Sequence, residues 1–275
     1  MPELPETETI ARDLDRELRG RRIVAVEVRR DDVLREVDVK ELGRRTKGSS
    51  IVRCWRRAKL VVIDLDSGDR LVVQPRFTGA LLLSRGPLPE REAAYSTLHF
   101  TLDDERDLHY RDIRRLGTVA LMSPARFDEY IGALGVEPLS DAFTAHALGE
   151  MLGASRQALK KVLMDQRLVV GIGNIYANEA CWRAGVDPSR IANSLDGDEM
   201  IGLHDGIVSV LRESIAARGT SFRDYVDASG GKGGFEQSLA AYGRGGEPCL
   251  RCGARLVETH AIDGRTTVLC ARCQR

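Results

Sequence analysis

The segment KLVVIDLDSGDRLVVQ, residues 59–74, decides the fold class of the first half of the chain. Two runs rich in branched residues flank DSGD at 66–69, which has the composition of a tight turn. Branched side chains suit a pleated sheet, and two such runs joined by a short turn predict a β-hairpin. This stretch therefore indicates antiparallel pairing of neighbouring strands.

Similar runs lie on both sides of this hairpin, without a helix between them. They are IVAVEV (23–28), IVRCWR (51–56), TLHFTL (97–102), DLHY (107–110) and TVALM (118–122), with DDER (103–106) as a second turn. Closely spaced strands of this kind predict an antiparallel sandwich. Before them, residues 5–20 read as an amphipathic helix, with Ile10, Leu14 and Leu18 on one face and Gly20 at its end.

Helical periodicity replaces the strand pattern after about residue 125. Helices are predicted within 154–166, 175–185 and 198–219, and a glycine-rich loop and a cysteine-bearing tail follow. The fold class is therefore predicted as α+β. We expect a helix-and-sandwich domain at 1–125, a helical domain at 126–240 and a small module at 241–275.

Composition limits the class of protein. A chain of 275 residues with 30% charged and 43% hydrophobic residues is typical of a globular protein, and two domains are favoured. The sequence has no run of about 18 apolar residues, and its N-terminus lacks the basic and apolar regions of a secretory signal. A cytoplasmic monomer without membrane segments is expected.

The charges of the chain balance but are unevenly distributed. Lys+Arg and Asp+Glu number 41 each, so the net charge gives no support for binding nucleic acid. Basic residues gather at 44–59 and 244–275, whereas acids concentrate in stretches such as 103–107. A local basic face can still bind a polyanion, because salt screens distant charges. Charge alone favours the simpler interpretation, a solvated surface.

Four cysteines form the most specific motif. Cys249 and Cys252 make one C-x-x-C pair and Cys270 and Cys273 a second, with 17 residues between the pairs. This spacing matches four-cysteine structural zinc sites. Disulfides are the alternative, but they are rare in a cytosolic chain. One structural zinc ion is therefore predicted, because four thiolates leave no ligand position open for water.

Two further motifs each allow two interpretations. The turn GIGN at 171–174 precedes a predicted helix, and Asn174 is placed to cap it. Such a turn either binds a phosphate on its backbone N–H groups or simply connects two helices. At the start of the chain, MPELPE would leave Pro2 with a free secondary amine once Met1 is removed. That arrangement either begins a helix or supplies a nucleophile.

Together these motifs resemble the formamidopyrimidine-DNA glycosylases, within the wider family that includes endonuclease VIII. The resemblance covers the whole chain. It rests on PELPE at the start, AKLVVIDL around Lys59, LMDQRLVVGIGNIYANEA at 163–180, AYGRGGEPC at 241–249 and the four cysteines. It implies a β-sandwich domain, a helix–two-turn–helix domain and a zinc-finger hairpin that bind damaged double-stranded DNA.

The resemblance also implies catalytic residues. Pro2 would be the amine nucleophile and Glu3 its partner acid and base, with Lys59 and Arg265 in the same catalytic group. Glu6 would either contact the reacting sugar or support the first helical turn, and a supporting role is favoured.

Further residues would bind the DNA. Asn174, Tyr242 and Arg265 would hold phosphates around the damaged nucleotide, and Lys160 matches a basic position of the family. Three positions match the residues that fill the gap left by a rotated-out base, namely Phe77, Arg114 and Leu116. Core packing is the alternative for Phe77 and Leu116.

The chain departs from the family pattern at Gln74, where a histidine implicated in phosphate contact is usual. An uncharged amide there predicts weaker DNA binding or altered substrate handling, with the chemistry of Pro2 intact. The glycine-rich loop at 229–235 is similar to that of the formamidopyrimidine branch. It would cap the rotated-out base, and its glycines suggest mobility before binding.

These residues predict a bifunctional glycosylase and abasic-site lyase that uses an imine at Pro2 and β,δ-elimination. Its substrates would be the oxidised purines 8-oxoguanine and formamidopyrimidine, with oxidised pyrimidines as the second choice. Two other functions are weighed against it. A non-catalytic zinc-finger protein would bind lesions without cutting, and a zinc-ribbon adaptor between proteins would leave the N-terminal motif unexplained.

Overall fold

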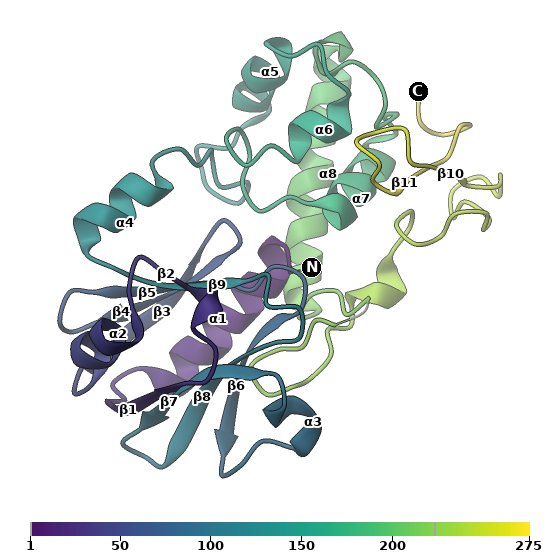
Figure 1. Cartoon of the computed structure of the whole chain (residues 1–275). Helices are drawn as coiled ribbons and strands as arrows, with labels where there is room; N and C mark the ends of the chain where they lie inside the picture. The colour runs from purple at the N-terminus through teal and green to yellow at the C-terminus, as the bar shows by residue number, and fades with distance from the viewer. Residues whose placement is uncertain (1, 223) are drawn as a thin grey trace. The chain divides into compact units, whose positions relative to one another are not determined.

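The computed structural model describes residues 2–222 and 224–275, which form two compact units (Figure 1). The first unit runs to residue 133 and also includes 217–234, and the second comprises 134–216 and 235–275. Residues 217–234 pack with the first unit because Tyr225 and Ala228 enter its core, where the Leu83 N–H donates to the Ala228 oxygen at 3.0 Å. The domain boundaries at 125 and 240 stay predictions. Removal of Met1 concerns a residue outside those described.

Two sheets of the first unit share one apolar core. The five-stranded sheet has the order β2 (Leu34–Arg35), β9 (Thr118–Met122), β5 (Arg70–Gln74), β4 (Leu60–Leu65) and β3 (Ile51–Arg57). The four-stranded sheet has the order β1 (Ile23–Val28), β7 (Ser96–Leu102), β8 (Arg106–Asp112) and β6 (Gly79–Arg85). Neighbouring strands pair antiparallel, but the short strand β2 runs parallel to β9.

The hairpin predicted over 59–74 is confirmed as β4 and β5. Val61 pairs with Val73, and the turn closes where the Leu65 N–H donates to the Asp69 oxygen at 2.9 Å. Gly68 lies in this turn with a φ of +88°, a conformation that glycine adopts without a Cβ clash. The second expected hairpin is also present, as the antiparallel pair β7 and β8.

Helix α1 (Leu4–Leu18) covers part of the sandwich core by packing on β3 and β4. Ile10, Leu14 and Leu18 are fully buried, as their spacing predicts. The remaining helices of this unit are shorter: η1 (Asp31–Val33), α2 (Val39–Thr46), α3 (Glu90–Ala93) and α4 (Pro124–Ile131). The N-terminal residues are therefore anchored by a helix that belongs to the core.

The second unit is helical and ends in a small hairpin. Its helices are α5 (Ala145–Gly153), α6 (Leu159–Leu163), α7 (Asn174–Ala184) and α8 (Gly197–Ala216), with the 3₁₀ turns η2 (Ala192–Ser194) and η3 (Phe235–Ser238). The two strands expected between the cysteine pairs are β10 (Val257–Thr259) and β11 (Thr267–Leu269), which pair antiparallel. Across the described residues, no helix combines the length and apolar character needed to cross a membrane.

The helix expected over 154–166 is wrong in extent, because α6 has only five residues. The backbone groups after α6 form hydrogen bonds with a segment that is not helical. The Gly135 N–H donates to the Gln166 oxygen at 2.9 Å, and the Val170 N–H donates to the Val136 oxygen at 3.0 Å. This pairing with residues 134–136 keeps the segment near 170 extended, so the helical ladder stops.

Strands β7 and β8 place two histidines side by side in the first unit. The Nδ1 atom of His109 lies 3.2 Å from Ser96 Oγ, and its Nε2 lies 3.1 Å from Ser84 Oγ. The His99 ring faces it with a centroid distance of 5.0 Å. Burial is the main cause, and the nearby His99 the second, of the lowering of the His109 pKa from 6.5 to about 4. His109 is therefore neutral in the folded protein at neutral pH.

This pKa predicts that the first unit loses stability in acid. In the unfolded chain His109 binds a proton near pH 6.5, so between pH 6.5 and 4 the unfolded chain binds more protons than the folded one. The free energy of unfolding should fall across this range by up to about 3 kcal/mol from this residue. Urea denaturation, followed by Trp55 fluorescence in a Trp182→Phe background, measures the effect.

A pair of variants isolates the contribution of this histidine. In His109→Gln, the free energy of unfolding should fall less between pH 6.5 and 4 than in the wild type. In His146→Gln, at an exposed position of α5, it should fall with the wild-type slope. Equal slopes in all three proteins would show that His109 does not carry the effect.

Candidate functional site

The start of α1 is held by a buried carboxylate. Pro2 and Glu3 are buried just before the helix, and Glu3 is its N-cap. Glu6 accepts the Glu3 N–H through Oε2 at 2.8 Å and the Thr220 N–H through Oε1 at 2.8 Å. Gly219 is required beside it, because its φ is +86° and a Cβ there would lie 3.0 Å from Glu6 Cγ. This geometry supports the supporting role expected of Glu6.

Lys59 lies in the turn between β3 and β4, and this turn is fixed to α1. Thr7 Oγ1 lies 3.5 Å from the Ala58 oxygen, which also accepts from Arg56 Nη1 at 3.0 Å. Ala58 has a φ of +54°, so the turn is sharp. The structure therefore brings Lys59 to the same end of the helix as Pro2.

Two loops of the first unit are joined through Asp112, which is fully buried. Its Oδ1 accepts from Thr78 Oγ1 at 2.5 Å and from the Arg114 N–H at 3.2 Å. Its Oδ2 accepts from the Gly117 N–H at 2.8 Å and from the Tyr110 hydroxyl at 3.2 Å. One carboxylate thus holds the loop before β6 against the loop between β8 and β9.

These loops present the three residues expected to fill a vacated base position. Phe77 is 44% exposed and Leu116 is 42% exposed, so core packing is not their role in this structure. The Arg114 guanidinium lies over the Phe77 ring, 5.0 Å from its centroid. Gln74, at the end of β5, accepts from Arg76 Nε at 3.2 Å. A cation therefore stands beside the uncharged amide.

Helix α7 begins one residue earlier than the predicted cap at Asn174 requires. Gly173 is the N-cap and Asn174 is the first helical residue, so the side-chain cap expected from Asn174 is wrong. The Asn174 backbone oxygen accepts from Asn178 Nδ2 at 2.6 Å. Its side-chain Oδ1 is buried and has no hydrogen-bond partner within the described part of the chain.

Buried polar residues dock the cysteine module onto this helical core. Asn178 Oδ1 accepts the Val268 N–H at 2.8 Å. Lys160 Nζ donates to the Thr266 oxygen at 2.7 Å and to Thr267 Oγ1 at 2.8 Å. Lys160 is fully buried, and its proposed contact to DNA stays a prediction. Its ammonium group holds the hairpin.

Glu179 fixes the segment before the cysteines to α7. Its carboxylate is fully buried and accepts the N–H groups of Ala240 and Ala241, each at 2.9 Å, and of Tyr242 at 2.8 Å. Burial raises the pKa of Glu179, and the three backbone hydrogen bonds oppose that rise. The backbone of Tyr242 is therefore positioned by α7.

Arg265 lines a cavity of about 310 Å³ in the second unit, together with other charged residues. Two of these cations already have partners, since Lys161 lies 3.2 Å from Asp263 and Arg167 lies 2.6 Å from Asp165. Arg265 is exposed and has no carboxylate partner in the described ranges. It is therefore available to bind an anion.

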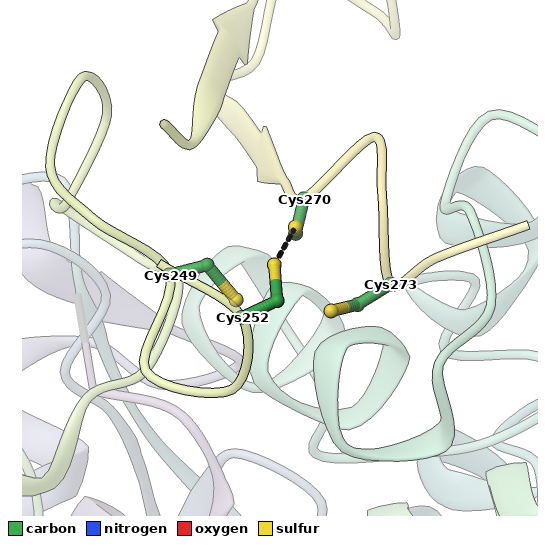
Figure 2. A group of neighbouring side chains, drawn as sticks. All are labelled: Cys249, Cys252, Cys270 and Cys273. Atoms are coloured by element: carbon green, nitrogen blue, oxygen red, sulfur yellow. Dashed lines mark hydrogen bonds between the residues drawn. The ribbon is translucent and has the colours of Figure 1, made fainter. Parts of the chain in front are cut away.

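The four cysteines point toward one another, as Figure 2 shows. Their sulfur atoms all lie within 4.8 Å of one another, and the Sγ atoms of Cys252 and Cys270 are 3.5 Å apart. A tetrahedral ion with bonds of about 2.3 Å to sulfur requires sulfur atoms about 3.8 Å apart. Burial opposes ionisation of Cys249, but the N–H groups of Arg251 and Cys252 lower its pKa to about 6. The residues fit a tetrahedral metal with thiolate ligands.

The sequence interpretation missed the residues that hold this site together. These residues are Asp112, Asn178, Glu179 and Thr220. No sequence motif predicted their hydrogen bonds, and most of their partners are distant in the sequence. The only signal is an acid or amide within an otherwise apolar helix, such as Glu179 in IYANEACW.

Three family models match the chain. The formamidopyrimidine-DNA glycosylase N-terminal domain matches residues 1–119, the formamidopyrimidine-DNA glycosylase H2TH domain matches 134–226, and the zinc finger found in FPG and IleRS matches 246–275. The chain is 41% identical to the formamidopyrimidine-DNA glycosylase of Heliobacterium modesticaldum, with 100% of both chains covered.

Solved structures give the same likeness. The chain is similar to a Lactococcus lactis FPG mutant in complex with a Fapy-dG containing DNA, with a TM-score of 0.93, 31% identity and 100% of both chains covered. It is also similar to Lactococcus lactis Fpg in complex with an abasic site containing DNA, with a TM-score of 0.92, 30% identity and 99% of both chains covered.

Metal removal should disorder the cysteine module and leave the first unit folded, because such modules fold only with their ion. Trp182 reports this change, since it packs on the cysteine cluster and Arg251 lies 4.3 Å from its ring centroid. In a Trp55→Phe background, a chelator should shift Trp182 emission and speed tryptic cleavage within 249–273.

Two substitutions serve as controls for chelation. Cys270→Ser should reproduce the chelated state, and Cys181→Ala, which removes a buried thiol outside the cluster, should retain the metal. Unchanged emission and cleavage after confirmed metal loss would refute this prediction.

Proposed function

The chain belongs to the formamidopyrimidine-DNA glycosylase family, and from this premise we propose that it excises oxidised purines from DNA through the amine of Pro2. The observation that carries the proposal is the burial of Pro2 and Glu3 at the start of α1, beside the turn that bears Lys59. The names of the relatives and the DNA complexes of the structural neighbours support the substrate class.

The reaction requires an unprotonated amine. An α-amino group has a pKa of about 7.7–8.0, whereas a lysine amine has a pKa of about 10.4, so the terminal amine is more often neutral at neutral pH. The Pro2 nitrogen attacks C1′ of the deoxyribose, and the C1′ bond to the damaged base breaks. The base leaves with the electron pair and takes a proton. Glu3 protonates the sugar oxygen as the ring opens, which yields an iminium.

Strand cleavage follows because the iminium withdraws electrons from the sugar. Loss of a C2′ proton expels the 3′ phosphate, and a second elimination expels the 5′ phosphate. Glu3 accepts and returns protons in these steps, and hydrolysis of the remaining imine frees Pro2. Met1 must be absent, since a peptide nitrogen is not a nucleophile.

We propose the DNA contacts from the exposure and charge of the side chains. The target base must leave the stack, and two apolar side chains and a cation, those of Phe77, Leu116 and Arg114, would fill its place. Asn174, Tyr242 and Arg265 would contact phosphates, and the lack of a carboxylate partner at Arg265 among residues 2–222 and 224–275 supports that role. The glycine-rich loop at 229–235 would cap the rotated-out base.

Zinc is the metal we assign to the four cysteines, because four thiolates in tetrahedral spacing are its usual structural ligands. When bound, the ion would hold the knuckles of the finger together, and no step of the reaction uses it. We place the enzyme in the cytoplasm as a monomer that associates with the nucleoid through DNA.

Replacing the nucleophile should abolish most of the chemistry. Pro2→Gly is expected to reduce abasic-site cleavage by about a hundredfold, because a primary amine cannot form the permanently charged iminium. Borohydride reduction with abasic DNA should trap the wild-type protein as a covalent adduct through Pro2. Pro5→Ala, which alters the same helix start but keeps the nucleophile, should retain trapping.

Two further measurements separate the alternatives. Mass spectrometry must show that Met1 is missing from the active protein. A duplex panel of formamidopyrimidine, 8-oxoguanine and oxidised pyrimidines ranks the substrate classes. Wild-type cleavage rates in Pro2→Gly would refute the nucleophile, and tight lesion binding without any adduct would favour the non-catalytic sensor.

Arg76 generates a second prediction. Its φ of +51° is a left-handed conformation that costs a non-glycine residue about 1 kcal/mol, and its guanidinium stands beside Gln74. Arg76→Gly should raise the free energy of unfolding by about 1 kcal/mol. It should also weaken duplex binding and reduce the slope of log affinity against log salt by about one.

The control for Arg76 is Glu105→Gly. Glu105 has a φ of +65° in the turn between β7 and β8, so this variant relieves similar strain without removing a cation. It should be stabilised equally and bind DNA as the wild type does. Equal affinity and salt slope in Arg76→Gly would exclude a phosphate contact by Arg76.

A further inference from the structure

Arg218 joins two buried carboxylates of the first unit. Its Nη2 lies 2.5 Å from Asp13 Oδ2, on α1, and 2.6 Å from Asp227 Oδ2. The side chains of Asp13 and Asp227 are 5% and 6% exposed, whereas that of Arg218 is 46% exposed. Asp13 also pairs with Arg16 at 3.2 Å, so Arg218 links two acids that are largely withdrawn from water and is the arginine partner of Asp227.

The second oxygen of Asp227 organises the glycine-rich loop. Asp227 Oδ1 accepts the Ser229 N–H at 3.0 Å, the Ser229 hydroxyl at 2.7 Å and the Gly231 N–H at 2.8 Å. Burial opposes ionisation of Asp227, but the bond from Arg218 and those from Ser229 and Gly231 keep its pKa below the ordinary value. The acceptor is therefore a carboxylate at neutral pH.

Backbone contacts fix the two ends of this loop. The Gly234 N–H donates to the Ala217 oxygen at 2.8 Å, and the Leu83 N–H donates to the Ala228 oxygen at 3.0 Å. Gly233 could not be larger, because a Cβ there would lie 2.2 Å from the Gly219 oxygen. The mobility that its glycines suggest is opposed by these contacts and by Asp227.

The same segment reaches the N-terminal turn. The Thr220 N–H donates to Glu6, which also holds the Glu3 N–H. Thr220, which makes this contact to the start of α1, is only two residues after Arg218 in the sequence. The loop and the nucleophile are fixed to one helix, through Asp13 and Glu6 respectively.

We propose that Arg218 is a positioning residue that holds residues 229–234 of the glycine-rich loop in a preformed conformation before DNA binds, and thereby selects the damaged base. The proposal rests on the proposed function, in which this loop caps the rotated-out base. A loop that is already ordered loses less conformational entropy when it closes on its ligand. Removing the cation would leave Asp227 buried without its arginine partner, whereas Asp13 would keep Arg16 at 3.2 Å, and the uncompensated charge of Asp227 would open the loop.

Arg218→Met tests the proposal, since it keeps much of the side-chain volume and removes the charge. Hydrogen exchange without DNA should show the amides of Ser229 and Gly231 exchanging about tenfold faster. Single-turnover excision of formamidopyrimidine from duplex should fall by about tenfold, because each closing event must now order the loop. Cleavage at a preformed abasic site, which has no base to cap, should change less than about twofold.

Arg126→Met is the matched control. Arg126 also bridges two carboxylates of the first unit, lying 2.9 Å from both Glu36 and Glu129, but far from the loop in sequence. It should leave exchange and excision at wild-type levels. If Arg218→Met fails to fold, Asp227→Asn takes its place. The amide oxygen of that variant still accepts from Ser229 and Gly231, so the same pattern is expected with a smaller, roughly threefold effect.

Three outcomes would overturn the proposal. They are unchanged exchange at Ser229 and Gly231, unchanged excision despite faster exchange, and an equal fall in excision and abasic-site cleavage. A wild-type protein that excises no lesion would refute the proposed function instead. In that case the exchange rates alone still decide whether Arg218 holds the loop.

Discussion

Buried carboxylates that accept backbone N–H groups are the interaction on which the functional loops of this protein depend. Besides Asp227, three that stand on or at the end of a helix or strand share this geometry: Glu6 at Glu3 and Thr220, Asp112 at Arg114 and Gly117, and Glu179 at Ala240, Ala241 and Tyr242. A buried N–H group without a partner destabilises a fold by about 1–3 kcal/mol, and an ionised acceptor forms the stronger kind of hydrogen bond. Because each carboxylate stands on or at the end of a regular element, the loops take their positions from the core.

The candidate functional residues are distributed over both units. The first carries Pro2, which we propose as the nucleophile, the Lys59 turn and the exposed residues Phe77 and Leu116. The second carries Arg265, the metal ligands and α7, whose buried polar side chains fix the segments on either side of the first cysteine pair. If the proposed roles hold, the chemistry rests on the first core and most of the phosphate contacts rest on the second, so a substitution in one core does not directly remove the groups of the other.

Local patterns allowed much of this to be predicted. The hairpin at 59–74 and the four-cysteine cluster follow from spacing alone, because neighbours in sequence form them. Contacts distant in sequence did not follow. The identity of a residue does not reveal its burial, so the hydrogen bonds of Asp112 and the burial of Lys160 were not predicted. Helix α6 ended early because residues near 170 pair with 134–136, a competition that helical periodicity does not register. The one-residue error at Asn174 arose because Gly173 takes the cap position.

The three N–H bonds at Glu179 have a consequence for behaviour in salt. Bonds from amides to a buried acceptor involve no counterions, so ionic strength scarcely alters them. Attraction to DNA phosphates, in contrast, depends on the release of condensed cations and weakens steeply as salt rises. With no net charge to add a long-range pull, the enzyme would dissociate from undamaged duplex at salt concentrations that leave its reactive geometry intact. Its search along a chromosome would then proceed by many brief encounters, each made with a site already assembled.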